Sequence, residues 1–193
     1  MNKQDTKQAL LNIGTDLIFQ KGYNHTGLNE VLEAADVPKG SFYYYFDSKE
    51  DFALQALDQF AARQKVRREG FLHDETLPPL SRLRAFFDWY IGELESVAYS
   101  QGCPLGNLGQ ELSNQNETMR LHISEMMGVV ANDVADCLLA AQQAGEINPA
   151  LDVQELAAFI YNSWQGAMLR MKITKSAGPL KTFLNTLFNV ILK

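Results

Sequence analysis

The residues with the clearest chemical potential are two lysines, Lys39 and Lys49, at the starts of consecutive predicted helices. A helix N-terminus exposes free N–H groups and the positive end of the helix dipole, so lysines placed there favour phosphate. Gly40 has no side chain and would let a phosphate approach that backbone closely. Hydroxyl groups able to bond phosphate oxygens or base edges follow at Ser41, Tyr43 and Tyr44. The segment therefore predicts binding to a nucleic acid.

Two short helices are needed to position these side chains. The sequence predicts a helix over residues 28–35 with its apolar residues on one face, and a second helix over 39–45. A tight turn at Asp36 and Val37 joins them. This arrangement is typical of a helix-turn-helix, in which the N-terminal residues of the second helix enter the major groove of DNA.

Aromatic residues of the second helix divide between its faces. Phe42 and Tyr45 share one face at a spacing of three residues, and with Phe46 they are expected to pack on the first helix. The hydroxyl-bearing residues at 41, 43 and 44 then point outward. A folded aromatic core without a binding role is the alternative for this cluster.

The same segment resembles the amino-terminal signature of the TetR family of transcriptional regulators. The resemblance runs from Thr26 through Ala35, over Lys-Gly-Ser-Phe-Tyr at 39–43, and over Tyr-Phe-Asp-Ser-Lys-Glu at 45–50. It implies that Thr26 caps the helix over 28–35 and touches phosphate. It also implies contacts with DNA bases or phosphates from Lys39, Gly40, Ser41, Tyr43, Tyr44 and Lys49. The family often has histidine at the position of Tyr44.

The fold class follows from apolar residues that recur at helical spacing almost throughout, which predicts an all-α protein of about nine helices. The expected helices span 4–21, 28–35, 39–45, 48–69, 79–99, a segment that starts near 104, 117–143, 152–174 and 179–192. Helix starts are indicated by Ser48 with Asp51 and by Asp152, and helix ends by Gly22 and Gly145.

A loop with two prolines after Gly70 marks the expected domain border. The helix-turn-helix domain is predicted over 1–47, with helix 48–69 as a connection. Residues 71–193 are predicted to form a helical domain for ligand binding and dimerisation.

Wide apolar stripes on the last two predicted helices need a cover. The resemblance implies that two copies of the chain pair these helices in a four-helix bundle, whereas an internal core is the alternative. The expected interface residues are Ile160, Trp164, Met168, Phe183, Leu184, Leu187 and Phe188. A two-fold dimer would place two recognition helices about 34 to 36 Å apart and read a palindrome.

An effector site is expected among aromatic and flexible apolar residues of the second domain. The candidate lining residues are Phe86, Trp89, Tyr90, Cys103, Met126, Met127, Tyr161 and Trp164. Cys103 precedes Pro104, which suits the first position of a helix, and a helix N-terminus lowers a cysteine pKa. The segment also resembles a TetR branch of electrophile-responsive repressors. The expected effector is therefore a small apolar, aromatic or electrophilic molecule, with an inert buried Cys103 as the alternative.

Charge limits how DNA could be bound. The chain carries a net charge of −6, and residues 1–70 hold nine lysines and arginines against ten aspartates and glutamates. Because phosphate neutralisation supplies much of DNA affinity, binding must depend on a few positioned cations. A helical protein-interaction module without DNA binding is the second hypothesis.

Other function classes lack their motifs in the sequence. The sequence has no His-Glu-x-x-His pair, no repeated Glu-x-x-His spacing and no zinc-type cysteine pair. We therefore expect no catalysis, no metal site and no cofactor. No apolar run reaches the roughly 20 residues of a membrane span, and two cysteines are too few for a disulfide framework. A cytoplasmic protein with no membrane partner is expected.

Overall fold

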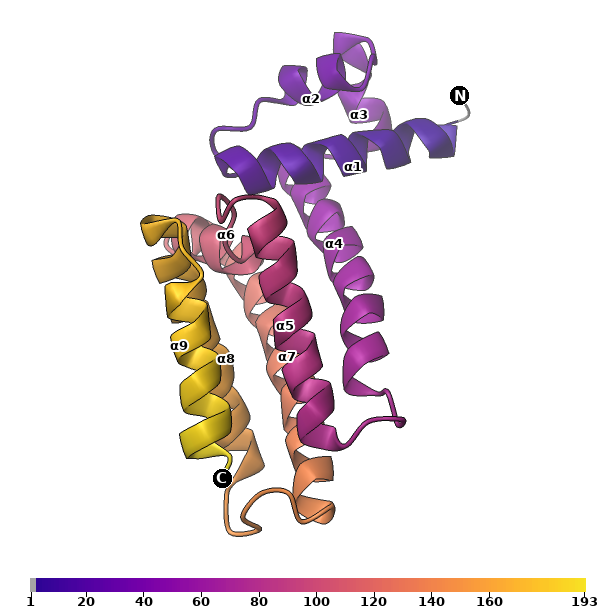
Figure 1. The fold of residues 1–193 in the computed structure, drawn as a ribbon. Helices are drawn as coiled ribbons and strands as arrows, with labels where there is room; N and C mark the ends of the chain where they lie inside the picture. Colours follow the sequence, from indigo (N-terminus) through magenta and orange to yellow (C-terminus); the bar gives the residue numbers. More distant parts are fainter. Residues whose placement is uncertain (1–2) are drawn as a thin grey trace. The chain divides into compact units, whose positions relative to one another are not determined.

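The computed structural model describes residues 3–193, and over that range the chain is helical without a strand (Figure 1). The elements are α1 (Lys3–Lys21), α2 (Leu28–Ala34), the 3₁₀-helix η1 (Lys39–Ser41), α3 (Phe42–Tyr45), α4 (Lys49–Leu72), α5 (Pro79–Ser96), α6 (Pro104–Leu112), α7 (Glu117–Gln143), α8 (Val153–Thr174), α9 (Gly178–Thr186) and the π-helix η2 (Leu187–Ile191). The predicted all-α class is confirmed. The expected helix over 39–45 is one 3₁₀ turn followed by one α-helical turn.

Local signals in the sequence set several of these helix ends. Gly22 follows α1 with a φ of 91°, a conformation that glycine adopts without a side-chain clash. The Ser48 hydroxyl accepts a hydrogen bond from the Asp51 N–H at 2.9 Å, just before α4. The Asp152 carboxylate accepts the N–H groups of Gln154 and Glu155 at the start of α8. These caps are the ones that the sequence predicted.

The chain divides into two compact units. The first contains the residues up to Gln64 together with Asn107–Ser124, and the second contains Lys65–Gly106 together with Glu125–Lys193. The division differs from the predicted border after Gly70, because the end of α6 and the start of α7 pack with the helix-turn-helix.

Close packing of α1 on α4 forms the core of the first unit. A Cβ added to Gly14 would lie 1.9 Å from Cζ of Phe52, so only glycine admits this ring. The Phe52 ring lies 5.6 Å from that of Phe42 and 4.8 Å from that of Phe46, in edge-to-face contacts. The recognition helix is thereby fixed to α1 and α4 through aromatic contacts.

In the second unit, α5, α8 and α9 lie alongside most of α7 (Figure 1). Its core is apolar and mostly aliphatic, with an aromatic cluster in which the ring centroids of Phe87 and Trp164 lie 4.9 Å apart. Arg68 is buried and pairs with Asp133, so the charge that enters this core has a partner.

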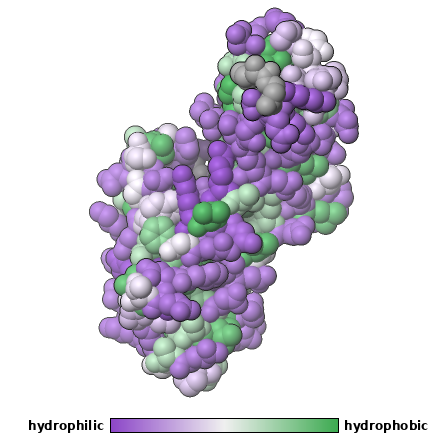
Figure 2. All heavy atoms as spheres, turned by 90° about the vertical axis from the view of Figure 1, so that its right-hand side faces the viewer, coloured by the Kyte–Doolittle hydropathy of each residue, from purple (hydrophilic) through white to green (hydrophobic). Residues whose placement is uncertain are grey.

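No helix within residues 3–193 combines the length and the apolar character that a membrane crossing requires. Figure 2 shows one face of the molecule, which is predominantly hydrophilic. Hydrophobic residues on that face gather in small separate patches.

Candidate DNA interface and effector region

The recognition helix, defined here as η1 with α3, separates its side chains as the sequence predicted. Phe42 and Phe46 are buried at 2% exposure each, whereas Tyr43 and Tyr44 are 72% and 63% exposed. Ser41 is half-buried, and Lys39 and Gly40 are exposed at the start of the helix. An aromatic core alone does not account for two tyrosines left in solvent, because their rings would be buried in such a core.

Each of the two predicted phosphate-binding lysines has a neighbour of its own. Nζ of Lys39 lies 2.6 Å from a carboxylate oxygen of Glu33, and both side chains are exposed. Nζ of Lys49 lies 4.5 Å from the ring centroid of Tyr23. Partial burial lowers the pKa of Lys49, and the nearby Glu111 carboxylate opposes that effect. Each lysine therefore has a partner within the first unit.

Thr26 does not cap α2, contrary to the prediction. The N-cap of α2 is Gly27, which provides no side-chain cap, and Thr26 is only 1% exposed. The Thr26 hydroxyl instead donates a hydrogen bond to the carbonyl of Gly22 at 2.8 Å. Its role is to close the turn after α1, where the hydroxyl is out of reach of a phosphate.

A carboxylate from α6 holds the same turn. Glu111 accepts hydrogen bonds from the backbone N–H groups of Tyr23 at 3.0 Å and of Asn24 at 2.7 Å. At the start of α7, Asn116 donates to Glu50. These contacts explain why residues 107–124 belong to the first unit. No local motif in the sequence distinguishes Glu111, because its partners are distant in the chain.

The expected effector residues divide into two sets. Phe86, Trp89, Tyr90 and Trp164 belong to one aromatic cluster, with centroids of Tyr90 and Trp164 5.8 Å apart. Met126 and Met127 lie on α7 and are not part of that core cluster. The cluster joins α5 to α8 and carries the phenol of Tyr90. Tyr161 of α8 is not part of it.

Cys103 lies directly before α6, as predicted, and is half-buried. Its Sγ accepts a hydrogen bond from Nε2 of Gln165 at 3.3 Å, which the sequence analysis did not anticipate. A Cβ on Gly106 would come within 2.8 Å of the Gln165 amide oxygen, so a larger residue there would displace the end of the Gln165 side chain.

The pKa of the Cys103 thiol is raised, whereas the sequence predicted a lowered pKa. Burial raises the pKa of the thiol, and it outweighs the opposing hydrogen bonds from Gln165 and the N–H groups of Gly106 and Leu105. Tyr90 and Tyr161 lie within electrostatic reach of the sulfur, and burial raises the pKa of both phenols. The resting group is therefore a neutral thiol near two neutral phenols.

Most of the expected dimer-interface residues are placed inside the protomer. Ile160, Trp164, Met168, Leu184 and Leu187 are each at most 4% exposed, and Phe183 and Phe188 pack partly buried against the same core. The apolar stripes of α8 and α9 are covered within one chain, because α5 and α7 supply the facing side chains. The five buried residues are thus core residues of one protomer, whereas Phe183 and Phe188 keep exposed surface. An interface through these helices would use their outer face, which Phe183 and Leu187 also border.

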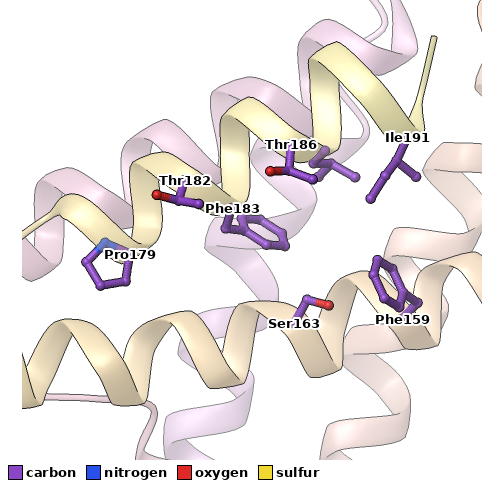
Figure 3. A pocket seen from close by; sticks show the side chains of 8 residues that line it. Phe159, Ser163, Pro179, Thr182, Phe183, Thr186 and Ile191 are labelled. Carbon is purple, nitrogen blue, oxygen red and sulfur yellow. The ribbon is translucent and has the colours of Figure 1, made fainter.

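That other face carries a groove of about 260 Å³ between α8 and α9. Figure 3 shows Phe159 and Ser163 extending from α8 toward α9, with Phe183 on the opposite side. Phe159 is 53% exposed. None of the expected effector residues lines this groove, so it is distinct from the Cys103 region.

Comparison with known proteins identifies the architecture. The model for "Bacterial regulatory proteins, tetR family" matches residues 10–56, and "Tetracyclin repressor-like, C-terminal domain" matches residues 79–187. The chain belongs to the TetR family. It is therefore a DNA-binding transcriptional regulator with an N-terminal helix-turn-helix, as the TetR-like signature implied.

Two curated repressors match over nearly their whole lengths. The chain is 34% identical over 192 residues to the HTH-type transcriptional repressor DhaR of Mycobacterium sp. (strain GP1), covering 100% of this chain and 95% of DhaR. It is 32% identical to the HTH-type transcriptional repressor NemR of Escherichia coli (strain K12), covering 99% and 98% of the two chains. Similarity to two repressors indicates repression as the mode of regulation.

Solved TetR structures agree with the fold. A regulatory protein TetR from Rhodobacter sphaeroides superposes with a TM-score of 0.89 at 32% identity, covering 95% of this chain and 97% of the other. The reduced form of Escherichia coli NemR superposes with a TM-score of 0.87 at 30% identity, covering 96% and 97%. The likeness thus extends over both units.

Proposed function

We propose that this TetR-type repressor binds a palindromic operator as a homodimer and is released by a small molecule that enters the region around Cys103. The observation that carries DNA binding is the recognition helix, which buries Phe42 and Phe46 and exposes Tyr43 and Tyr44 beside Lys39. Thr26 is left out of the proposed contacts because it is buried. Gly40, Ser41 and Lys49 complete the set.

Dimerisation is proposed through the outer face of α8 and α9, because the inner face is already covered. Phe159 is exposed beside the groove, Leu169 and Ile173 are exposed apolar side chains of α8, and Val190 is an exposed apolar side chain of η2, which continues α9. Exposed apolar residues gathered in this way favour burial against a second copy. A two-fold axis would bring two recognition helices to successive major grooves of a palindrome.

For the effector, the aromatic cluster and Cys103 favour an apolar or aromatic molecule, including electrophiles. An activated double bond would accept the Cys103 thiol, with formation of a C–S bond and transfer of the thiol proton to the neighbouring carbon. Release from DNA requires a coupling free energy of about 1 to 3 kcal/mol between the two sites.

Binding to the DNA that flanks the gene tests the DNA part of the proposal. Affinity would be measured at several salt concentrations for the natural chain, a Lys39→Ala/Tyr43→Ala double variant, and Lys181→Ala as a control on α9. We expect tight, salt-dependent binding to a palindrome, lost in the double variant and kept in the control. Salt-insensitive binding would favour a protein-interaction module. Failure to select any specific sequence from random DNA would overturn the proposal.

A further inference from the structure

We infer that the start of α1 extends the DNA-binding surface beyond the helix-turn-helix, with Lys3 as a phosphate-binding residue seated on Tyr44. This rests on the proposed operator binding. Nζ of Lys3 lies 3.9 Å from the ring centroid of Tyr44, and Nζ of Lys7 lies 5.3 Å from that of Phe46. Because Lys3 and Lys7 are four residues apart, they share one face of α1. The two contacts place that face next to the recognition helix, and Figure 1 shows α1 running beside α3.

The first unit carries a net negative charge, so DNA binding depends on the few lysines near the recognition helix. The unit holds seven lysines and arginines against eleven aspartates and glutamates. Lys21 pairs with Glu30, and Arg120 pairs with Glu117. A unit with this net negative charge repels DNA unless cations stand where phosphates pass. Lys3 supplies a positive charge beside the exposed Tyr44, and Lys7 supplies a second one beside Phe46.

Their position also complements that of Lys39. Lys39 lies at the first residue of the recognition helix and Tyr44 near its end, which separates them by roughly 8 Å along the helix. The major groove is about 12 Å wide between its two phosphate backbones. Cations at both ends of the short helix can therefore reach different phosphates of the groove that the helix enters. Lys3 is exposed, so a phosphate can replace solvent around its ammonium group without breaking a buried contact.

Salt dependence separates a phosphate contact from a packing role. Operator affinity would be measured from about 50 to about 200 mM salt for the natural chain, Lys3→Gln and Lys3→Arg, with Lys181→Gln as an equal loss of charge on α9. We expect Lys3→Gln to weaken operator and unrelated DNA alike, by about three- to tenfold, and to reduce the slope of log K against log[salt] by about 0.9 for each bound protomer. Lys3→Arg and Lys181→Gln should keep the natural slope.

The role of Tyr44 gives a second measurement. Tyr44→Leu removes the ring on which Lys3 sits, so adding Lys3→Gln to it should cost less than in the natural chain. An unchanged slope in Lys3→Gln, with tight binding by the natural chain, would overturn the inference alone. A loss of affinity without a change of slope would assign Lys3 to packing and also overturn it. Absence of specific binding by the natural chain would defeat the proposed function and this inference together.

Discussion

The carboxylate of Glu111 accepts a hydrogen bond from the backbone N–H of Tyr23, 3.0 Å away, across 88 residues of sequence. With the second bond from Asn24, the charge of Glu111 satisfies two N–H groups in the turn between α1 and α2. Hydrogen bonds to a charged group stabilise more than neutral ones. This turn therefore depends on a side chain from another part of the sequence.

Replacement of Glu111 should weaken the first unit. Glu111→Gln keeps the size of the side chain but loses its charge and one acceptor, and we expect the free energy of unfolding to fall by about 1 to 3 kcal/mol. Chemical denaturation measures this change. Glu125→Gln, at an exposed position on α7, is the matched control and should have almost no effect. Equal stabilities of the two variants would contradict the assigned role.

Release of Lys39 from Glu33 should strengthen DNA binding. Glu33→Gln removes the carboxylate 2.6 Å from Nζ of Lys39, so this lysine meets phosphate without first breaking an ion pair. Exposed ion pairs contribute about 0 to 1 kcal/mol, which corresponds to a gain in operator affinity of up to about fivefold. Glu30→Gln, which frees Lys21 instead, is the comparison. A loss of affinity in Glu33→Gln would show that the ion pair positions Lys39.

Reaction of Cys103 with a maleimide should accelerate with pH. Because burial raises its pKa, the thiol is mostly protonated near pH 7, and the reactive thiolate increases about tenfold per pH unit below the pKa. Mass spectrometry of a Cys137→Ser variant follows the reaction of Cys103 alone. In the natural chain Cys137 should contribute little, because burial raises its pKa to about 11. Gln165→Leu removes a hydrogen bond to the sulfur and should slow the reaction further. A rate independent of pH from 6 to about 9 would refute the neutral resting thiol.

Two substitutions on α8 should separate the proposed dimer surface from the core. Phe159→Glu places a charge on the exposed face and should give a folded monomer with weakened operator binding. Trp164→Ala empties a core position and should lower the free energy of unfolding by about 3 to 5 kcal/mol. Sedimentation and thermal unfolding distinguish these outcomes. A stable dimer in Phe159→Glu would exclude this face as the interface.

Much of the fold was predictable because its signals are local. The spacing of Phe42 and Tyr45, the glycine after α1 and the cap at Asp152 each act within a few residues, so sequence alone indicated helices and outward faces. Glu111 and Gln165 were not predictable, since their partners are distant in sequence. The stripes on α8 and α9 showed that a cover was needed, but an apolar stripe does not specify which chain provides it. At Cys103 the expected helix N-terminus is present, but burial has the larger effect on the pKa.

Residues 107–124 fold with the first unit, and this has a consequence for protein engineering. The DNA-binding part is not a continuous piece of the gene, so a fragment cut after α4 lacks Glu111 and leaves two N–H groups of the Tyr23 turn without their acceptor. A hybrid regulator that joins the chain after α4 to a DNA-binding domain from another protein would keep Glu111 but lose the Tyr23 turn that it binds. Its α6 and α7 junction would have to be exchanged along with that domain.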